Sequence, residues 1–363
     1  MAVIPGDGIG HEIIPPTLEL LTRAQDALGG FKLKFETRTD VGAGHFRDTG
    51  EDMSAAAFDA AGAADAILLG AIGLPDVRHP DGTEIAPHLK MRDRFGLYGG
   101  VRPVKAYPNT PQRLADPRAA SIDLIILRES TEGLFYSHGR GEMIGDQEAR
   151  ETLSITRPVT EKLCDLAFAL ARRRREKGGK GHVTCVDKAN VFRAFAFFRK
   201  IFTERAARHP DIDHGFAYVD AQALDLIRQP WAFDVLVMEN MFGDILSDLG
   251  GGLVGGMGMA SCAELGDEHA LFQPAHGTAP DIAGQDKANP LATILSGALM
   301  LDWLAQRHSI PEAGQAADAI NGAVEDAFAT GGLAPMEFGG PQGTKEAART
   351  VAAALERRLD AYR

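Results

Sequence analysis

Residues 1–28 read MAVIPGDGIGHEIIPPTLELLTRAQDAL, and this stretch indicates the fold class. Residues 2–4 form a short apolar run, a glycine-rich turn follows, and the apolar spacing over residues 12–28 predicts a helix. Strands that alternate with helices are typical of an α/β architecture with a largely parallel sheet. Further strand-like runs lie at residues 31–37, 66–69, 122–127, 183–186 and 235–238.

The length and the composition of the chain restrict its class. A chain of 363 residues is longer than one hydrophobic core usually supports, so we expect two domains, or two lobes around a cleft. Hydrophobic residues make up 45% and charged residues 24%, which excludes a disordered or coiled-coil chain. The net charge of −12 argues against a nucleic-acid partner, and an anionic substrate would need a local basic pocket.

The cysteines and the chain ends bear on the compartment. Cys164, Cys185 and Cys262 lie far apart, which argues against a disulfide framework or a cysteine zinc site and favours a reducing environment. The first residues contain no basic leader, and the longest apolar stretches are too short to span a bilayer. We therefore expect a cytoplasmic protein that contains no membrane segment.

Two glycine-rich segments and one basic segment call for an interpretation. GLYGGVR at residues 96–102 and GGGLVGGMG at residues 250–258 are candidate crossing points between lobes, because glycine tolerates the backbone angles of a hinge. The basic run at residues 171–182 is more typical of a helix end followed by a glycine cap than of a nucleic-acid site.

The glycine loop PGDGIGHE at residues 5–12 is similar to a dinucleotide-binding fingerprint. That fingerprint needs its third glycine one residue later, where this chain has His11. A structural turn explains the three glycines equally well. The loop alone therefore does not decide between the two readings.

The segment FGDILSD contains Asp244 and Asp248, and four residues of spacing place both carboxylates on one face of a helix. Adjacent like charges are destabilising unless a cation lies between them. A solvated helix start is the alternative, but the apolar neighbours Phe242 and Ile245 indicate a buried wall. We therefore favour a hard divalent cation such as Mg²⁺, which prefers oxygen ligands.

Two more candidates follow predicted strands. Lys188 stands in VDKANV and Asp220 in YVDAQA, at the strand ends where ligands gather in α/β proteins. An ordinary surface ion pair is the alternative for the lysine. Arg92, Arg102 and Arg128 lie close to apolar or glycine-rich segments, and three converging guanidinium groups would suit a di- or tricarboxylate.

Taken in order, these segments resemble the β-decarboxylating dehydrogenase family, which includes 3-isopropylmalate, isocitrate, homoisocitrate, tartrate and D-malate dehydrogenases. The resemblance extends over nearly the whole chain and implies a two-lobed isopropylmalate/isocitrate dehydrogenase-like α/β fold, not a Rossmann fold. It implies a larger, cofactor-binding lobe at residues 1–98 plus 255–363, and a smaller lobe with the dimer interface at residues 99–254. The matching segments are PGDGIGHE, LLGAIG, RESTEG, VDKANV, YVDA, FGDILSDL and HGTAPDIAGQDKANP.

The resemblance also implies roles for the candidate residues. Lys188 would be the catalytic base, and Asp220, Asp244 and Asp248 would hold Mg²⁺ or Mn²⁺. The active sites of a homodimer would be shared, with the lysine and the first aspartate supplied by the partner subunit. The arginines would bind the carboxylates of a small malate-type substrate. The NAD site would comprise Ile9, His276, Gly277, Ala279, Asp281, Ile282 and Asn289.

One position departs from the family pattern. The tyrosine that would protonate the enol after loss of CO₂ is replaced by Phe135, and Tyr136 follows it. On a strand, neighbouring side chains point to opposite faces, so Tyr136 would reach the site only if the backbone slipped by one residue. Tyr136 is therefore a candidate acid, but we favour the alternative in which Phe135 packs in the tyrosine's place and Tyr136 faces solvent or the dimer arm.

The substrate is the least determined feature. His88 lies four residues before Arg92, where the family contacts the variable side group, and a histidine indicates a smaller or more polar group than isopropyl. We expect NAD- and metal-dependent oxidative decarboxylation of a 2-hydroxy acid with a 3-carboxylate, of the 3-isopropylmalate, tartrate or D-malate type. Asp281 would favour NAD by repelling a 2′-phosphate, although it could instead cap a helix. Isocitrate or homoisocitrate dehydrogenase and a non-catalytic regulatory homologue in a hetero-oligomer are the alternatives.

Overall fold

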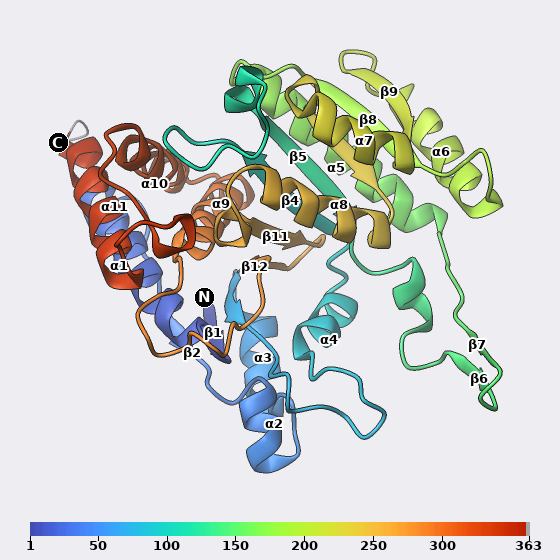
Figure 1. Cartoon of the computed structure of the whole chain (residues 1–363), viewed down its shortest axis with the longest axis horizontal. Helices are drawn as coiled ribbons and strands as arrows, with labels where there is room; N and C mark the ends of the chain where they lie inside the picture. Colours follow the sequence, from blue (N-terminus) through green and yellow to red (C-terminus); the bar gives the residue numbers. More distant parts are fainter. Residues whose placement is uncertain (361–363) are drawn as a thin grey trace.

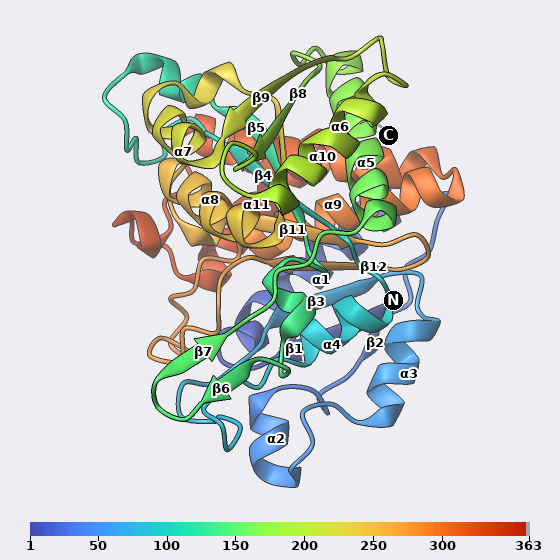
Figure 2. The same cartoon turned by 90° about the vertical axis from the view of Figure 1, so that its right-hand side faces the viewer.

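The computed structural model describes residues 1–360, which fold around one ten-stranded sheet (Figures 1 and 2). The strand order is β2-β1-β3-β12-β11-β4-β5-β10-β8-β9. Its strands are β1 (Ala2–Gly6), β2 (Glu36–Thr37), β3 (Ile67–Ala71), β4 (Gly99–Lys105), β5 (Asp123–Glu129), β8 (His182–Asp187), β9 (Asp213–Tyr218), β10 (Val235–Met238), β11 (Ser261–Leu265) and β12 (Ala270–Pro274).

Helices cover both faces of the sheet, and a separate hairpin of β6 (Glu142–Ile144) and β7 (Glu148–Arg150) projects from the body (Figure 2). No helix within residues 1–360 has the combined length and apolar character needed to cross a membrane. The helices are α1 (Gly10–Leu28), α2 (Ala43–Thr49), α3 (Ala55–Ala63), α4 (Pro87–Arg94), α5 (Arg157–Glu176), α6 (Arg193–Ala206), α7 (Val219–Arg228), α8 (Asn240–Leu253), α9 (Leu291–His308), α10 (Pro311–Ala329) and α11 (Thr344–Leu359).

Strand β5 shows why these apolar runs form inner strands. Ile125 and Leu127 pack in the same core cluster as α5, whereas Leu124 and Ile126 pack on the opposite face with α7 and α8. A strand that is buried on both faces needs apolar side chains at every position, which produces a continuous run instead of an alternating one. The runs predicted at residues 66–69, 122–127, 183–186 and 235–238 are all strands.

The centre of the sheet differs from a Rossmann sheet. β11 is antiparallel to both β12 and β4, and β4 is antiparallel to β5, while the other pairings are parallel. β4 and β11 join the strands of the two predicted lobes into one sheet, and α1 packs against α11 near the chain ends. The lobe boundaries themselves stay a prediction.

One expectation about local structure was wrong. Only Glu36–Thr37 of the strand expected at residues 31–37 forms a strand, because this edge segment lies exposed beside β1. The glycine-rich segment at residues 96–102 runs into β4 (Gly99–Lys105), which is paired on both sides, and its role as a crossing point between lobes stays a prediction. In the other glycine-rich segment, at residues 250–258, residues 250–253 complete α8. The basic run at residues 171–182 does include the end of α5, as predicted.

Candidate active site

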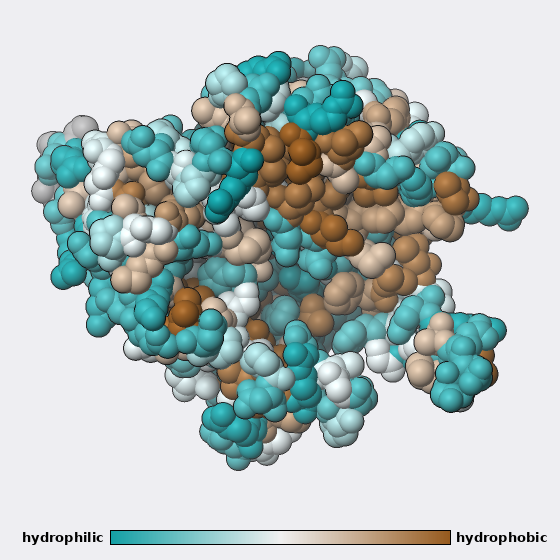
Figure 3. Space-filling model, in the orientation of Figure 1, coloured by the Kyte–Doolittle hydropathy of each residue, from teal (hydrophilic) through white to brown (hydrophobic). Residues whose placement is uncertain are grey.

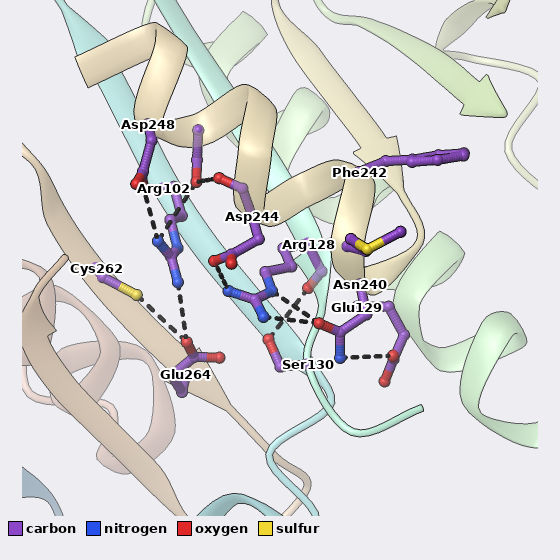
Figure 4. A network of polar contacts seen from close by, with 12 residues as sticks. Arg102, Arg128, Glu129, Ser130, Asn240, Phe242, Asp244, Asp248, Cys262 and Glu264 are labelled. Carbon is purple, nitrogen blue, oxygen red and sulfur yellow. Dashed lines mark hydrogen bonds and ion pairs between the residues drawn. The ribbon is translucent and has the colours of Figure 1, made fainter. Parts of the chain in front are cut away.

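Three arginines from different elements meet around Glu264 at the central strands. Figure 4 shows two of them, Arg102 and Arg128, below the aspartates of α8. Arg92 lies in the last turn of α4, Arg102 in β4 and Arg128 in β5, and all three are buried. Glu264 of β11 lies between them, with Oε1 2.8 Å from Nη2 of Arg92 and 3.7 Å from Nη2 of Arg102. The structure thus brings the three predicted arginines together, with a carboxylate that the motifs did not indicate.

Helix α8 packs across this arginine cluster. A Cβ on Gly243 would lie 2.6 Å from Cβ of Arg128, so the glycine permits the close approach of the helix. Arg128 donates to Oδ1 of Asn240 from Nε at 3.1 Å and from Nη2 at 2.7 Å, and it also pairs with Asp244. Burial and the two other arginines lower the pKa of Arg128 to about 10.

Asp244 and Asp248 occupy one face of α8, as their spacing predicts. Oδ1 of Asp248 lies 4.0 Å from Nη1 of Arg102. The expectation that this face is a buried wall was wrong, because the two aspartate side chains are 52% and 59% exposed and Ile245 is 61% exposed. Within residues 1–360, the outer side of this helix, where Ile245 lies, is left exposed. Partial desolvation, with a smaller contribution from the neighbouring Asp244, raises the pKa of Asp248 against the opposing charge of Arg102.

Lys188 and Asp220, the other predicted site residues, form a separate pair. Lys188 follows β8 and Asp220 begins α7 after β9, both at strand ends. Nζ of Lys188 is 2.7 Å from Oδ1 of Asp220, and this contact lowers the pKa of the aspartate. Within the described residues no three His, Cys, Asp or Glu side chains are grouped closely enough to hold a metal ion. Asp220 therefore does not join Asp244 and Asp248 inside one chain.

The segment around Phe135 and Tyr136 is a 3₁₀ helix, η2 (Leu134–Ser137), and not a strand. The expected alternation of faces was therefore wrong, because Gly133, at a φ of +70°, turns the chain into this helix directly after the loop. The Phe135 ring lies 5.8 Å from the guanidinium of Arg128. Tyr136 is 48% exposed, and the guanidinium of Arg140 lies 5.0 Å from its ring.

His88 lies one turn before Arg92 on α4. Its Nδ1 has no hydrogen-bond partner in the described part of the chain, and the side chain is half-buried. Burial and the charge of Arg92 lower the pKa of His88 to about 3. The imidazole is thus neutral at pH 7, and it can donate or accept a hydrogen bond without adding charge.

A separate pocket of about 450 Å³ lies between the glycine loop and the HGTAPDIAG segment. Burial lowers the pKa of His276, whose Nδ1 lies 2.8 Å from the carbonyl oxygen of Gly277, so the neutral ring leaves Nε2 as a free acceptor. Asp281 is exposed and does not line the pocket. The predicted cofactor residues on its wall are Ile9, His276, Gly277, Ala279, Ile282 and Asn289.

The glycine loop has a structural explanation. A Cβ on Gly8 would lie 2.2 Å from the carbonyl oxygen of Thr278, which accepts a hydrogen bond from the Ile9 amide at 2.9 Å. The φ of Gly8 is +53°, a conformation that favours glycine. The loop is thus shaped by packing against the segment that forms the other wall of the pocket.

Motif reasoning did not indicate three polar residues of these two sites, Glu264, Asn240 and Glu337. Glu264 could have been found, because a carboxylate within the apolar strand SCAEL must have a cationic partner if it is buried. Glu337 lines the second pocket and accepts from the Gly258 amide at 3.1 Å and from Nδ2 of Asn289 at 2.8 Å. Its 3₁₀ helix η5 (Met336–Phe338) carries no sequence signal of a site.

Comparisons with known proteins agree with this architecture. Residues 1–351 match the model of the family described as isocitrate/isopropylmalate dehydrogenase. The chain is 40% identical to the 3-isopropylmalate/3-methylmalate dehydrogenase of Methanocaldococcus jannaschii over 97% of both chains. It is 37% identical to the 3-isopropylmalate dehydrogenase of Aquifex aeolicus over 100% of this chain and 98% of the relative.

A solved structure shows the same fold. The crystal structure of isocitrate dehydrogenase from Methylococcus capsulatus superposes with a TM-score of 0.82 at 32% identity, over 98% of each chain. The predicted fold class is thereby confirmed. The chain belongs to the isocitrate/isopropylmalate dehydrogenase family and is a decarboxylating oxidoreductase that acts on a CH–OH group.

Proposed function

We propose that the protein catalyses the NAD- and divalent-metal-dependent oxidative decarboxylation of a malate-type 2-hydroxy acid that carries a 3-carboxylate, of the 3-isopropylmalate type. One observation carries this proposal: three buried arginines converge opposite two carboxylates on one helix face. Guanidinium groups bind a substrate carboxylate, and the paired carboxylates fit a hard cation. We place the enzyme in the cytoplasm, where its three buried thiols would stay reduced.

The residues on α8 fit a divalent metal. Asp244 and Asp248 lie one turn apart, and both side chains are more than half exposed, so a cation can reach both carboxylates. Asp220 would be the third ligand. A bound Mg²⁺ or Mn²⁺ supplies a Lewis acid that lowers the pKa of the substrate hydroxyl and stabilises negative charge on oxygen. Arg102 and Arg128, which now pair with these aspartates, would then turn to the substrate carboxylate.

The chain's own residues account for the remaining steps. Lys188 would take the proton from the hydroxyl while hydride leaves for bound NAD, and the arginines would hold the carboxylate until CO₂ is lost. Phe135 lies near Arg128, where a general acid would be needed, and it cannot donate a proton. We infer that protonation of the enol is slow unless water or another group assists.

A homodimer would complete the site. Within the described residues, Asp220, which pairs with Lys188, is not grouped with the aspartates of α8, and in the proposed dimer the second copy would supply both residues. The surface of α7 and α8 offers a large apolar area for that copy (Figure 3). Exposed apolar patches of this kind mark association sites. The exposed apolar side chains on these two helices are Leu224, Ile227, Met241 and Ile245.

The pocket beside the glycine loop fits the adenosine end of NAD. Its unpartnered acceptor, Nε2 of His276, suits the exocyclic amino group of an adenine, and the apolar side chains of Ile9 and Ile282 suit the ring faces. Bound NAD accepts the hydride. Ala279 adopts a φ of +37°, an unusual conformation for a residue with a Cβ, which is typical of functional loops.

A substrate panel tests the proposal. Purified protein is assayed with NAD⁺ and Mn²⁺ against 3-isopropylmalate, tartrate, D-malate, isocitrate and homoisocitrate, and NADH absorbance is followed. We expect a malate-type diacid to be oxidised and excess EDTA to abolish turnover, because the α8 carboxylates need their cation. Full activity in EDTA would contradict the metal assignment. No turnover with any acid would support the alternative of a non-catalytic homologue.

A further inference from the structure

Glu264 is a permanent part of the arginine cluster. Its side chain is fully buried in the middle of β11, 2.8 Å from Arg92 and 3.7 Å from Arg102. Gly100 of β4 makes room for it, since a Cβ there would lie 3.1 Å from Oε2 of Glu264 and 2.7 Å from Oγ of Ser130. Burial alone would raise the pKa of Glu264, but the three arginines outweigh it and lower that pKa, so the group is ionised at pH 7.

The two aspartates of α8 behave differently from Glu264. Asp244 and Asp248 are about half exposed, so a metal ion can draw them away from Arg128 and Arg102. Glu264 has no exposed surface to turn to, and leaving it unpaired in the interior would be costly. It therefore continues to neutralise one of the three arginine charges after substrate and metal bind.

The remaining donors suit one carboxylate. Nε of Arg92 and Nε of Arg102 are buried and have no hydrogen-bond partner among residues 1–360, and Arg128 is released when Asp244 binds the cation. Over the completed site, three arginines, Lys188 and a divalent cation face Glu264 and the three aspartates, which leaves two positive charges for two substrate carboxylates. A third carboxylate would need another cation, because an unpaired buried charge is strongly unfavourable.

The neighbouring cavity does not provide that cation. It has a volume of about 530 Å³ and lies next to Arg92 and Phe135. Lys90 on its wall is already paired with Asp52 at 2.7 Å, and Arg140 is packed over the Tyr136 ring. The wall carries as many carboxylates as cations, the carboxylates being Asp52, Glu84 and Asp93.

We propose that Glu264 is a specificity-determining residue that restricts the site to dicarboxylates, which places one carboxylate on the arginines and leaves the side group uncharged. This inference rests on the proposed function, because it assigns the substrate class of the same site. It predicts that malate-type acids are substrates and that isocitrate, a tricarboxylate, is rejected by its extra charge.

Calorimetry on the intact enzyme with NADH and Mg²⁺ tests the proposal without chemistry. The probes are methylsuccinate and tricarballylate, which share a succinate backbone and differ by a methyl group against an acetate arm. We expect methylsuccinate to bind at least about tenfold more tightly, and Glu264→Gln to reduce that ratio about tenfold, as expected for removal of one nearby buried charge. Glu264→Asp should keep the preference, because the charge stays.

A matched control is Asp234→Asn, which removes a buried carboxylate that pairs with Arg174 far from this pocket and should leave the ratio unchanged. Equal or tighter binding of tricarballylate by the unmodified enzyme overturns the proposal, whether or not Glu264→Gln folds. An unchanged ratio in Glu264→Gln, or no binding of either probe, also overturns it. Charge-selective binding without NADH formation from any 2-hydroxy acid contradicts the proposed function alone.

Discussion

The arginine cluster and the Lys188–Asp220 pair are the two halves of the candidate site, and they differ in how far one chain builds them. Arg92, Arg102 and Arg128 are buried and contact Glu264 or Asn240, and they are positioned by α4 and by strands β4 and β5 of the central sheet. The lysine pair lies at the surface, where the Asp220 side chain is 69% exposed.

The difference indicates which half is preorganised by folding and which by association. A carboxylate-binding half must be desolvated to be selective, so it lies in the core of the chain. The half that moves protons contains the Lys188–Asp220 ion pair, 2.7 Å long with a mostly exposed aspartate, and such a pair contributes little stability on its own. It would gain its proper environment when a second copy covers α7 and α8.

The largest effect is expected from Lys188→Ala. Removal of the general base should lower kcat by roughly 10²–10⁴-fold and leave substrate binding nearly unchanged, because the arginines are untouched. Steady-state kinetics at saturating NAD⁺ and Mn²⁺ measure the split between kcat and KM. Lys105→Ala, which removes a surface lysine paired with Glu325, is the matched control. A loss confined to KM would show that Lys188 binds substrate and is not the base.

A mixed dimer tests whether the halves come from different chains. Lys188→Ala and Asp248→Asn homodimers should both be nearly inactive. A heterodimer with one chain of each, co-expressed with two affinity tags, would contain one intact site and one with both defects, so about half of the normal activity should return. If a stable heterodimer shows far less than half of the normal activity, each chain supplies its own lysine.

Inner strands and strand-end residues were predictable because their causes are local. The apolar runs at residues 122–127 and 235–238 are strands buried on both faces, and Lys188 and Asp220 follow strands as expected. The exposure of Asp244 and Asp248 was not predictable, because the apolar Ile245 beside them is itself exposed within residues 1–360.

The backbone near Arg128 was also not predictable. We expected Phe135 and Tyr136 to lie on a strand, with their side chains on opposite faces, but the turn at Gly133 starts a 3₁₀ helix there. Glu264 pairs with Gly100 of β4, 164 residues earlier in the sequence, so only the folded sheet shows that it meets two arginines.

A smaller effect is expected at Phe135, which belongs to the buried half. Phe135→Tyr should place a hydroxyl near the Arg128 guanidinium, 5.8 Å from the present ring, and raise turnover by about tenfold if enol protonation limits the rate. Tyr136→Phe, at an exposed position, is the matched control and should change little. If Tyr136→Phe instead destroys activity and Phe135→Tyr gives no gain, Tyr136 is the acid.

The smallest effect is expected in the cofactor pocket. Like the arginine cluster, this pocket is lined by residues of one chain. We expect NAD⁺ to be used with a higher kcat/KM than NADP⁺, because a carboxylate near the ribose repels a 2′-phosphate. Glu337 lines the pocket, whereas Asp281 is exposed outside it. Glu337→Gln should therefore reduce the NAD⁺ preference about fivefold, equivalent to ~1 kcal/mol for a solvated charge pair, and Asp281→Asn should reduce it less.

The ratio of kcat/KM for the two cofactors is the measurement, and thermal unfolding checks that both variants stay folded. A larger shift in Asp281→Asn would mean that the loop carrying Asp281 closes over the bound ribose. A preference of the unmodified enzyme for NADP⁺ would refute the cofactor assignment.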